Sequence, residues 1–373
     1  MIMSRTFYEF FAGGGMARAG LGVGWKCLLA NDLDRKKAET YKLNWGSDGL
    51  IVDDIRNILP EAMPGKPDLV WGSFPCQDLS LAGARAGLGG SRSGTFWAFI
   101  DHIQTLKNEA RAPALIALEN VPGTVTSNDG KDFVAICQVL ADLGYKAGAI
   151  VVDAAHFVPH SRPRLFIIGL RNDLEIPSSL VTKGPKAPWH TTGLIKAYER
   201  LPLHLQSNWQ WWKLPKPLKL STRFADLVEE NPASIEWHTP LETMQLLLMM
   251  NEANLKKVAV AKAAGAKIVG TIYKRTRKEQ GRKFQRAEVR FDGLAGCLRT
   301  PRGGSSRQVL MIIKNDQIRS RLISPRETAR LMGLRDTYLL PERNNEAYHL
   351  TGDGVAVPVV RYIAKHFFEE LVR

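Results

Sequence analysis

The sequence predicts an α/β fold with a doubly wound sheet and a second, smaller domain. Through residue 172, apolar runs of strand length alternate with helical stretches. Several of the predicted strands end directly in glycine, cysteine or an acidic residue, at the sheet edge where open α/β sheets hold their ligands. After residue 172 the alternation stops, and residues 175–240 are rich in proline, serine and tryptophan. We therefore expect one sheet domain and one domain of different character.

Composition limits the class of protein. The chain has 373 residues, of which 45% are hydrophobic, which suits a globular protein with two domains. Its four cysteines are widely scattered, with no Cys-x-x-Cys pair and no histidine cluster, which predicts a reduced, cytoplasmic protein without a structural zinc. The N-terminus lacks the apolar core of a signal peptide, and no apolar run approaches the ~18 residues of a membrane span. The formal net charge of +14 favours a polyanionic partner over a generally basic surface.

Residues 6–31 predict a strand, a glycine turn, a short helix and a second strand. The glycine turn runs from Ala12 to Gly15, and Asp32 follows Gly13 by 19 residues (32 − 13). An acid at this spacing can bind ribose hydroxyls, and glycines let the backbone approach a cofactor closely. Arg18 stands at the third position of the Gly-x-Gly-x-x-Gly pattern, which disfavours a pyrophosphate and hence a nicotinamide cofactor. The turn therefore favours a nucleoside that lacks a pyrophosphate.

The next two strands also end in residues with chemical functions. Residues 50–55 form a strand that ends in acids, and Asp54 is either a contact for an adenine amino group or an ordinary helix N-cap. Residues 69–71 form a strand that leads into Phe74, Pro75 and Cys76. Pro75 fixes its own φ and keeps Phe74 out of the helical region, so Cys76 stands on a stiff turn. Cys76 is a candidate nucleophile, although an isolated cysteine is more often a small buried apolar residue.

Two further strands carry candidate site residues. Residues 114–118 end at Glu119, whose carboxyl group could hold a proton at the sheet edge, or could be a cap or an ion-pair partner. Arg162 and Arg164 precede a strand at residues 165–169, and extended backbone would point both to the same side. Such a pair could hold a carbonyl oxygen or a phosphate, or could be an ordinary surface pair.

The segments before and after these strands are of other kinds. Residues 82–94 form a glycine-rich loop that could close over a substrate, and residues 95–107 have helical periodicity. The tryptophans at positions 209, 211 and 212 could stack on bases or form a small core, and the sequence supports both equally. Residues 274–286 concentrate cations with little acid, which favours phosphate binding over a solvated surface. Residues 297–308 form a cationic loop with glycines, which suits close approach to a polyanion.

Together these groups suit methyl transfer to a pyrimidine carbon. C5 of cytosine is a poor nucleophile, and addition of a thiolate to C6 converts it into an enamine carbon that can attack a sulfonium methyl group. A protonated Glu119 on N3 and an arginine on O2 would neutralise the charge that develops on the ring. Loss of the C5 proton and β-elimination would then release Cys76.

The chain resembles the DNA (cytosine-5) methyltransferases of bacteria and their phages over nearly its whole length. The motifs that carry the resemblance stand in the family's order: Phe11-Ala-Gly-Gly-Gly, Pro75-Cys76-Gln77, Glu119-Asn120-Val121 and Arg162-Pro-Arg164. Any one of them alone is weak, whereas the set in this order is specific. The sequence departs from the family pattern at His160, where the family has glutamine, and at Asp353, where it has asparagine.

The resemblance implies three groups of site residues. The implied catalytic residues are Cys76, Glu119, Arg162 and Arg164. The implied cofactor-binding residues are Phe11, Gly13, Gly15, Asp32, Leu33, Asp54, Ile55, Phe96 and Asp353. The implied substrate-binding residues are Phe74, Pro75, Gln77, Ser80, Arg299, Arg302, Gly303, Gly304 and Arg307.

The resemblance also implies the fold and the partners. The expected fold is a Rossmann-like S-adenosylmethionine-dependent methyltransferase sheet at residues 1–177, with a smaller, irregular target-recognition domain at 178–318 and a hinge with a C-terminal return at 319–373. The expected cofactor is S-adenosylmethionine, which leaves as S-adenosylhomocysteine, and no metal is expected. The expected partner is double-stranded DNA, from which the target cytosine is flipped out, and a cognate restriction endonuclease would act separately. A monomer in the bacterial cytoplasm or in a phage-infected cell, with no membrane contact, completes the expectation.

Two other functions remain open from the sequence. RNA cytosine-5 methyltransferases share the catalytic domain, and the large basic insert favours duplex DNA without deciding between them. A DNA-binding protein that keeps the fold without activity is disfavoured, because Cys76, Glu119 and Arg164 are all present. No residue-to-base code can be read from residues 178–318.

Overall fold

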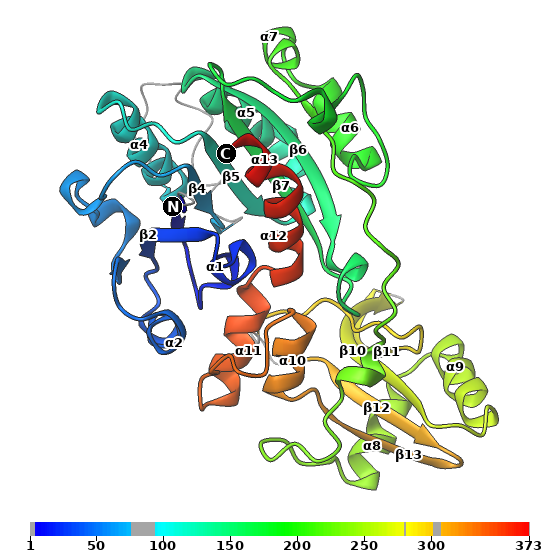
Figure 1. Ribbon diagram of the computed structural model, residues 1–373. Coiled ribbons are helices and arrows are strands. Elements are labelled where there is room, and N and C mark those ends of the chain that lie inside the picture. Colours follow the sequence, from blue (N-terminus) through cyan, green and yellow to red (C-terminus); the bar gives the residue numbers. More distant parts are fainter. Residues whose placement is uncertain (1–3, 76–93, 280, 301–306, 373) are drawn as a thin grey trace. The chain divides into compact units, whose positions relative to one another are not determined.

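The computed structural model describes residues 4–75, 94–279, 281–300 and 307–372 (Figure 1). The chain forms two compact units. The first, here called the sheet unit, comprises Met1–Asp153, Pro163–Lys216 and Val359–Arg373, and the second comprises Ala154–Arg162 and Pro217–Pro358. Within the described ranges, no helix is long and apolar enough to cross a membrane.

The sheet unit confirms the predicted α/β fold. Its main sheet has seven strands among the described residues, in the order β3-β2-β1-β4-β5-β7-β6. The first five strands pair in parallel, whereas β7 runs antiparallel to both β5 and β6. The strands are β1 Arg5–Phe10, β2 Trp25–Asn31, β3 Leu50–Ile51, β4 Leu69–Gly72, β5 Leu115–Asn120, β6 Tyr145–Asp153 and β7 Pro163–Arg171. Because β1, β2, β4 and β5 are parallel, the predicted site residues that follow them share the carboxyl edge of one sheet.

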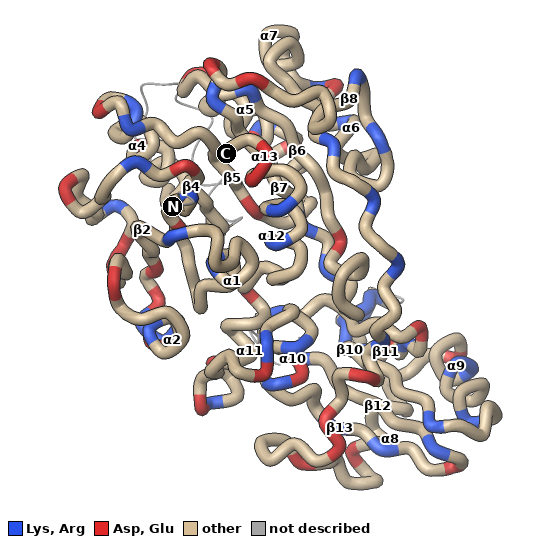
Figure 2. Tube along the Cα trace, in the orientation of Figure 1, with Lys and Arg blue, Asp and Glu red and all other residues tan. Residues whose placement is uncertain are grey.

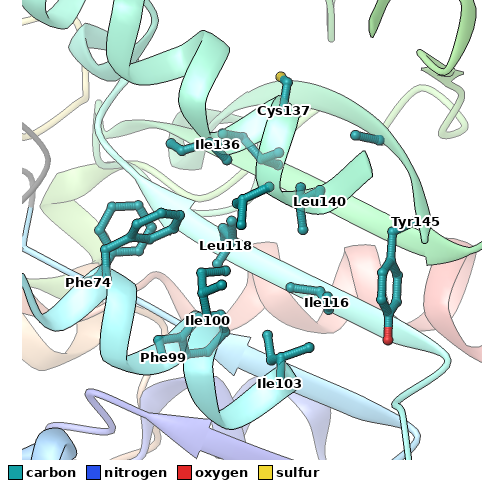
Figure 3. Close-up of a cluster of buried hydrophobic side chains, with 14 of the residues drawn as sticks. Phe74, Phe99, Ile100, Ile103, Ile116, Leu118, Ile136, Cys137, Leu140 and Tyr145 are labelled. Carbon is teal, nitrogen blue, oxygen red and sulfur yellow. The ribbon is translucent and has the colours of Figure 1, made fainter. Parts of the chain in front are cut away.

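Helices cover this sheet and pack apolar side chains against it. They are α1 Met16–Leu21, α2 Arg35–Trp45, α4 Thr95–Asn108, α5 Lys131–Asp142, α6 Thr192–Glu199, α7 Leu203–Ser207, α12 Val357–Ile363 and α13 Glu369–Leu371. Figure 3 shows the core that results: Phe99 and Ile103 of α4 and Leu140 of α5 lie with Ile116 and Leu118 of β5. All six residues of β5 are buried, as expected for a central strand covered on both faces.

The tryptophan cluster belongs to the core of the sheet unit. Trp209, Trp211 and Trp212 are exposed by only 6, 7 and 0%. Trp212 Nε1 donates to the carbonyl oxygen of Ile168 in β7 at 3.1 Å, and the backbone N–H of Gln210 donates to Ala147 in β6 at 2.7 Å. Of the two interpretations that the sequence left open, the structure selects the core. The sheet unit therefore extends to residue 216, beyond the boundary at 177/178 that the sequence predicted.

The second unit has a four-stranded antiparallel sheet with the order β11-β10-β12-β13. The strands are β10 Ile268–Glu279, β11 Arg282–Arg290, β12 Val309–Lys314 and β13 Gln317–Leu322. The helices are α8 Pro240–Leu248, α9 Glu252–Ala263, α10 Pro325–Leu331 and α11 Asn344–Asp353. Ile272, Val289 and Met311 from three of the strands pack with Leu246 of α8 and Val258 of α9 in its core.

Candidate active site

The glycine turn after β1 is fastened to the end of β2. The N–H of Gly13 donates to Asp32 Oδ2 at 2.7 Å, and the N–H of Ala12 donates to the carbonyl of Asn31 at 2.9 Å. Phe11, Gly13 and Gly15 all have positive φ values, of 58°, 56° and 76°. A non-glycine residue in this region is strained, and such strain clusters at ligand-binding turns. Burial raises the pKa of Asp32 against the opposing effect of its hydrogen bonds.

The two glycines of this turn face different surroundings. A Cβ on Gly15 would stand 2.4 Å from Trp45 Nε1 and 2.9 Å from the Tyr41 ring, so only glycine fits there. No atom of the described residues lies within 4 Å of the corresponding position at Gly13. Gly15 therefore seats the turn on α2, while Gly13 leaves room for a ligand to approach the backbone closely.

The glycine turn is supported by three side chains that pack together: Arg18, Tyr41 and Trp45. Trp45 Nε1 donates to the carbonyl of Gly14 at 3.0 Å, and Arg18 Nη1 donates to Tyr41 Oη at 2.8 Å. The Arg18 guanidinium also lies 5.1 Å from the Trp45 ring centroid, within cation–π range. The sequence identified Arg18 only as an obstacle to a pyrophosphate. The structure shows that it packs against α2.

Glu9 is a buried carboxyl group that the sequence analysis did not single out. It lies in β1 with 2% of its surface exposed, and it accepts a hydrogen bond from the N–H of Arg18 at 3.4 Å. Burial raises its pKa to about 8. Its Oε2 has no hydrogen-bond partner among the described residues. The available signal was a single carboxylate within the apolar run of β1.

Asp54 caps the turn that follows β3. Its Oδ1 accepts from the N–H and the Nε of Arg56, both at 2.9 Å, and the Arg56 hydrogen bonds lower its pKa to about 2. The segment is held by Asn31, whose Nδ2 donates to the carbonyls of Ile51 and Asp53. The cap interpretation of Asp54 is therefore confirmed. Its contact with an adenine amino group stays a prediction, and an ionised carboxylate is a suitable acceptor for that group.

The three apolar residues predicted for the cofactor differ in exposure. Leu33, directly after Asp32, has 65% of its surface exposed. Ile55 is buried, and its carbonyl hydrogen bonds with His102 Nε2 at 2.7 Å. Phe96 is fully buried, with its ring centroid 5.0 Å from that of Phe74. Leu33 is thus the member of this set that presents apolar surface to solvent.

The segment that leads to Cys76 is tied to the end of β5. Asn120 Nδ2 donates to the carbonyl of Phe74 at 3.1 Å, and Asn120 Oδ1 accepts from the N–H of Val121 at 2.8 Å. Phe74 is buried against Phe96 and Pro75 is exposed. Cys76, Gln77 and Ser80 lie outside the described residues. The tie nevertheless holds the residues immediately before Cys76 next to those that follow Glu119.

Glu119 and Arg164 form an ion pair at this edge. Arg164 Nε lies 3.0 Å from Glu119 Oε1, and the two side chains are exposed by 14% and 7%. They come from the neighbouring antiparallel strands β7 and β5. Two opposite charges, largely shielded from water, are therefore held together where β5 ends. The ion-pair interpretation that the sequence left open for Glu119 is the one that the structure shows.

Arg162 has entirely different surroundings from Arg164. It is 1% exposed, belongs to the second unit, and donates to the backbone carbonyls of Leu298, Gly352 and Gly354 at 2.7–2.9 Å. The two arginines therefore have different partners, and their joint role as a pair stays a prediction. Arg162 directly precedes β7, which begins at Pro163, and Arg164 lies within that strand.

The match with the protein-family model decides the family. The model for C-5 cytosine-specific DNA methylases matches residues 5–369. The chain belongs to this family. It is an enzyme of the DNA (cytosine-5) methyltransferase type, and methyltransferases of this family generally use S-adenosylmethionine.

Individual relatives are similar to this chain in sequence over nearly its whole length. The Type II methyltransferase M.HpaII of Haemophilus parainfluenzae is 26% identical over 388 residues, covering 98% of this chain and 90% of its own. M.HhaI of Haemophilus parahaemolyticus is 26% identical over 360 residues, covering 96% and 92%. Among solved structures, a DNMT2 variant from Spodoptera frugiperda has a TM-score of 0.63 at 17% identity, covering 97% of this chain and 99% of its own. That structure supports the fold.

The remaining predicted residues of this methyltransferase lie in its second unit. Arg299 and Asp353 are exposed. Arg307 hydrogen bonds with Asn345 Oδ1, and its guanidinium lies 5.6 Å from the Tyr348 ring centroid. Arg302, Gly303 and Gly304 lie outside the described residues.

Proposed function

We propose that this methyltransferase transfers a methyl group to C5 of a flipped-out cytosine in a specific duplex DNA sequence, through a covalent bond between Cys76 Sγ and C6. The Glu119–Arg164 ion pair carries the proposal. It places a carboxyl group and a guanidinium together at the strand end that Asn120 ties to Phe74, two residues before Cys76. A cytosine ring needs a nucleophile for C6, a proton for N3 and a donor for O2. Glu119 and Arg164 suit the last two roles, and Cys76, two residues after Phe74 in the sequence, suits the first.

The protein's residues then act in a defined order. The Cys76 thiolate adds to C6, and electron density moves toward N3 and O2. Arg164 donates to O2, which weakens its pairing with the Glu119 carboxylate. Glu119 takes up a proton from solvent and passes it to N3. C5 is then an enamine carbon that is nucleophilic enough to be methylated. A solvent water or hydroxide ion then takes the C5 proton, the C5–C6 double bond forms again as the C6–S bond breaks, and Cys76 leaves as the thiolate. N3 returns its proton to Glu119, which restores the ring and the enzyme.

The residues at the ends of β1 to β3 fit S-adenosylmethionine. Asp32 offers a carboxylate for ribose hydroxyls, Gly13 leaves space beside the backbone, Asp54 is an ionised acceptor for an amino group, and Leu33 is an exposed apolar side chain. When bound, this cofactor supplies an electrophilic methyl group on a sulfonium. Phe11, Gly15, Ile55, Phe96 and Asp353 remain proposed contacts or supports of the same cofactor.

We propose that a two-stranded ribbon of the second unit, residues 273–279 of β10 and 282–288 of β11, contacts the DNA. β12 pairs with β10 only along Ile268 to Ile272, so the ribbon has no third strand beside it among the described residues. The major groove of DNA is wide enough to admit a two-stranded β-ribbon. Lys and Arg, blue in Figure 2, occur along both strands.

The charge pattern of the ribbon supports a polyanionic partner. Arg275 stands directly opposite Arg286, and Lys278 directly opposite Lys283. Like charges in these positions destabilise a hairpin, and phosphates would relieve that repulsion. Arg275 lies 4.7 Å from the centroid of the Tyr273 ring, which fixes its guanidinium over an aromatic face. Arg299, Arg302, Gly303, Gly304 and Arg307 are proposed as further DNA contacts.

The relatives named as Type II methyltransferases suggest a biological setting. We propose that the enzyme acts as a monomer in the cytoplasm and protects DNA from a cognate endonuclease that acts separately. No metal takes part in the proposed chemistry, so transfer should be unchanged by EDTA.

Methylation of a host genome tests the proposal. Wild type and Cys76→Ala are expressed in a host without cytosine methylation, and both genomes are read by bisulfite sequencing. A short motif protected from conversion only in the wild type is the expected result. Protection in both would refute the role of Cys76. If the folded wild type protects no DNA cytosine, the same preparation is assayed on RNA, and transfer there would replace DNA as the substrate.

A further inference from the structure

The connection between β6 and β7 belongs to the second unit, although both strands belong to the sheet unit. Its residues, 154–162, are held there by a backbone ladder. The N–H of Ser161 donates to the carbonyl of Ala295 at 3.0 Å, and the N–H of Ala295 donates to the carbonyl of Pro159 at 2.8 Å. Arg162, the last residue of this connection, is therefore fixed by the second unit before the chain enters β7.

The Arg162 guanidinium joins two distant segments of that unit. One nitrogen, Nη2, donates to the carbonyls of Gly352 and Gly354, each at 2.7 Å, and Nη1 donates to the carbonyl of Leu298 at 2.9 Å. The two glycine carbonyls flank Asp353. A buried guanidinium is stable only when its donors are satisfied, and backbone carbonyls can satisfy them without any second charge. Both terminal nitrogens of Arg162 are thus directed at backbone carbonyls, and Nη1 also lies 3.7 Å from Cys297 Sγ.

The backbone segments that Arg162 joins are in direct contact with each other. A Cβ on Gly352 would stand 2.8 Å from the carbonyl carbon of Arg299 and 2.8 Å from the nitrogen of Thr300. Only glycine allows this approach. The turn that carries Asp353 is therefore packed on the segment that carries Arg299, and Arg162 holds both.

His160 reinforces the same arrangement from two residues away. It is fully buried, its Nε2 accepts from the N–H of Leu298 at 3.1 Å, and its Nδ1 lies 3.2 Å from the carbonyl of Leu331. Since an N–H can only donate and a carbonyl can only accept, these partners require a neutral imidazole with its proton on Nδ1. A glutamine side chain also has one acceptor and one donor group. The departure from the family pattern at position 160 thus preserves the hydrogen-bonding capacity.

We propose that Arg162 is a positioning residue, and that with His160 it fixes the Asp353 turn and the Leu298–Arg299 segment in one arrangement. Arg162 does not touch the cytosine; Arg164 alone of the two arginines does. This inference rests on the proposed function, because that function assigns Asp353 to the cofactor and Arg299 to DNA. It changes the expected consequence of mutation, since loss of Arg162 should weaken binding while loss of Arg164 should slow the chemical step.

Arg162→Lys and Arg164→Lys form the matched test. A lysine keeps the charge but cannot reach three carbonyls in a planar fork. For Arg162→Lys we expect KM for S-adenosylmethionine and Kd for DNA to rise about tenfold, with the single-turnover rate at saturation within about threefold of wild type. For Arg164→Lys we expect the single-turnover rate at saturation to fall, with KM for S-adenosylmethionine and Kd for DNA close to the wild-type values. A slow saturated rate with unchanged affinities in Arg162→Lys would overturn the proposal.

A second pair of variants and a readout without catalysis separate this inference from the proposed function. His160→Gln should behave as wild type, and His160→Leu should reproduce the binding defect of Arg162→Lys. Hydrogen exchange should show faster exchange at residues 295–300 and 350–355 in Arg162→Lys and His160→Leu, and wild-type protection in His160→Gln. Unchanged protection in Arg162→Lys and His160→Leu would refute the positioning role of Arg162 and His160, whether or not the enzyme methylates DNA. If Cys76→Ala kept its activity, the covalent mechanism would be refuted, and the positioning role of Arg162 and His160 would be unaffected.

Discussion

At the carboxyl edge of the sheet, Glu119, Arg164 and Asp32 are largely shielded from water and hydrogen bonded or paired. Glu119 is paired with Arg164, and Asp32 accepts from the N–H of Gly13. Along the β10–β11 ribbon one ion pair, Arg277–Glu288, is present, but like charges also face each other: Arg275 lies opposite Arg286 and Lys278 opposite Lys283. Groups that act on a reacting ring must be placed beforehand, at an energetic cost that packing offsets. Groups that meet a polyanion can repel each other until the partner arrives.

Breaking the Glu119–Arg164 pair should have the largest effect. We expect Glu119→Gln to lower the single-turnover transfer rate by about 10²–10⁴-fold, because the amide cannot donate a proton to N3. Binding of DNA should change little. The matched control is Glu109→Gln, which removes a carboxylate paired with Arg111 at the surface of the same unit. Equal rates for Glu119→Gln and its control would remove Glu119 from the chemistry.

The cost of burying charge at the sheet edge can be measured at Glu9. Its pKa is about 8 in the folded protein against 4.5 in the unfolded chain, so between these values the folded state holds a proton that the unfolded state has lost. Stability therefore falls as pH rises from about 4.5 to about 8, and Glu9→Gln removes this loss. In urea unfolding, we expect the variant to gain stability relative to wild type across this window, by on the order of a few kcal/mol at its upper end. A difference that does not vary with pH would contradict the assignment.

Neutralising Arg275 and Arg286, which face each other across the ribbon, tests the other half of the comparison. We expect Arg275→Gln with Arg286→Gln to raise Kd for DNA about 10–100-fold, and to reduce the slope of log K against log salt by about two. Stability should not fall, because the two charges face each other. The control replaces Lys256 and Lys262 of α9, two lysines outside the ribbon. Equal losses in both double variants would make the ribbon an ordinary basic surface.

The smallest expected effect concerns the support of the glycine turn by Trp45. Trp45→Phe keeps the ring and removes the hydrogen bond to Gly14, so we expect KM for S-adenosylmethionine to rise about 2–10-fold with little change in kcat. Trp25→Phe also removes an indole hydrogen bond, but one to Glu369, which is not part of the glycine turn. The same KM in both variants would show that Trp45 does not position the turn.

Local features could be predicted from the sequence, and long-range ones could not. The ends of β2, β4 and β5 follow from short apolar runs with clear stops, and the predicted helix at residues 95–107 is confirmed as α4. The surroundings of Arg162 could not be predicted, because its partner Gly352 is 190 residues away and offers only a backbone carbonyl. The ribbon was also hidden, because its strands carry cations on both faces and lack the apolar alternation that marks a half-buried strand.

The central claim is that Cys76 bonds to C6 of the cytosine held by Glu119 and Arg164. It can be tested with duplex DNA that carries the motif found by bisulfite sequencing, with 5-fluorocytosine at the target position. Fluorine at C5 cannot leave as a proton, so methylation should stop with the enzyme still attached. We predict a denaturation-resistant protein–DNA complex, with the adduct mapped to Cys76 and absent from Cys76→Ala. A complex mapped to another residue, or none from an enzyme that methylates ordinary cytosine in that motif, would contradict the mechanism.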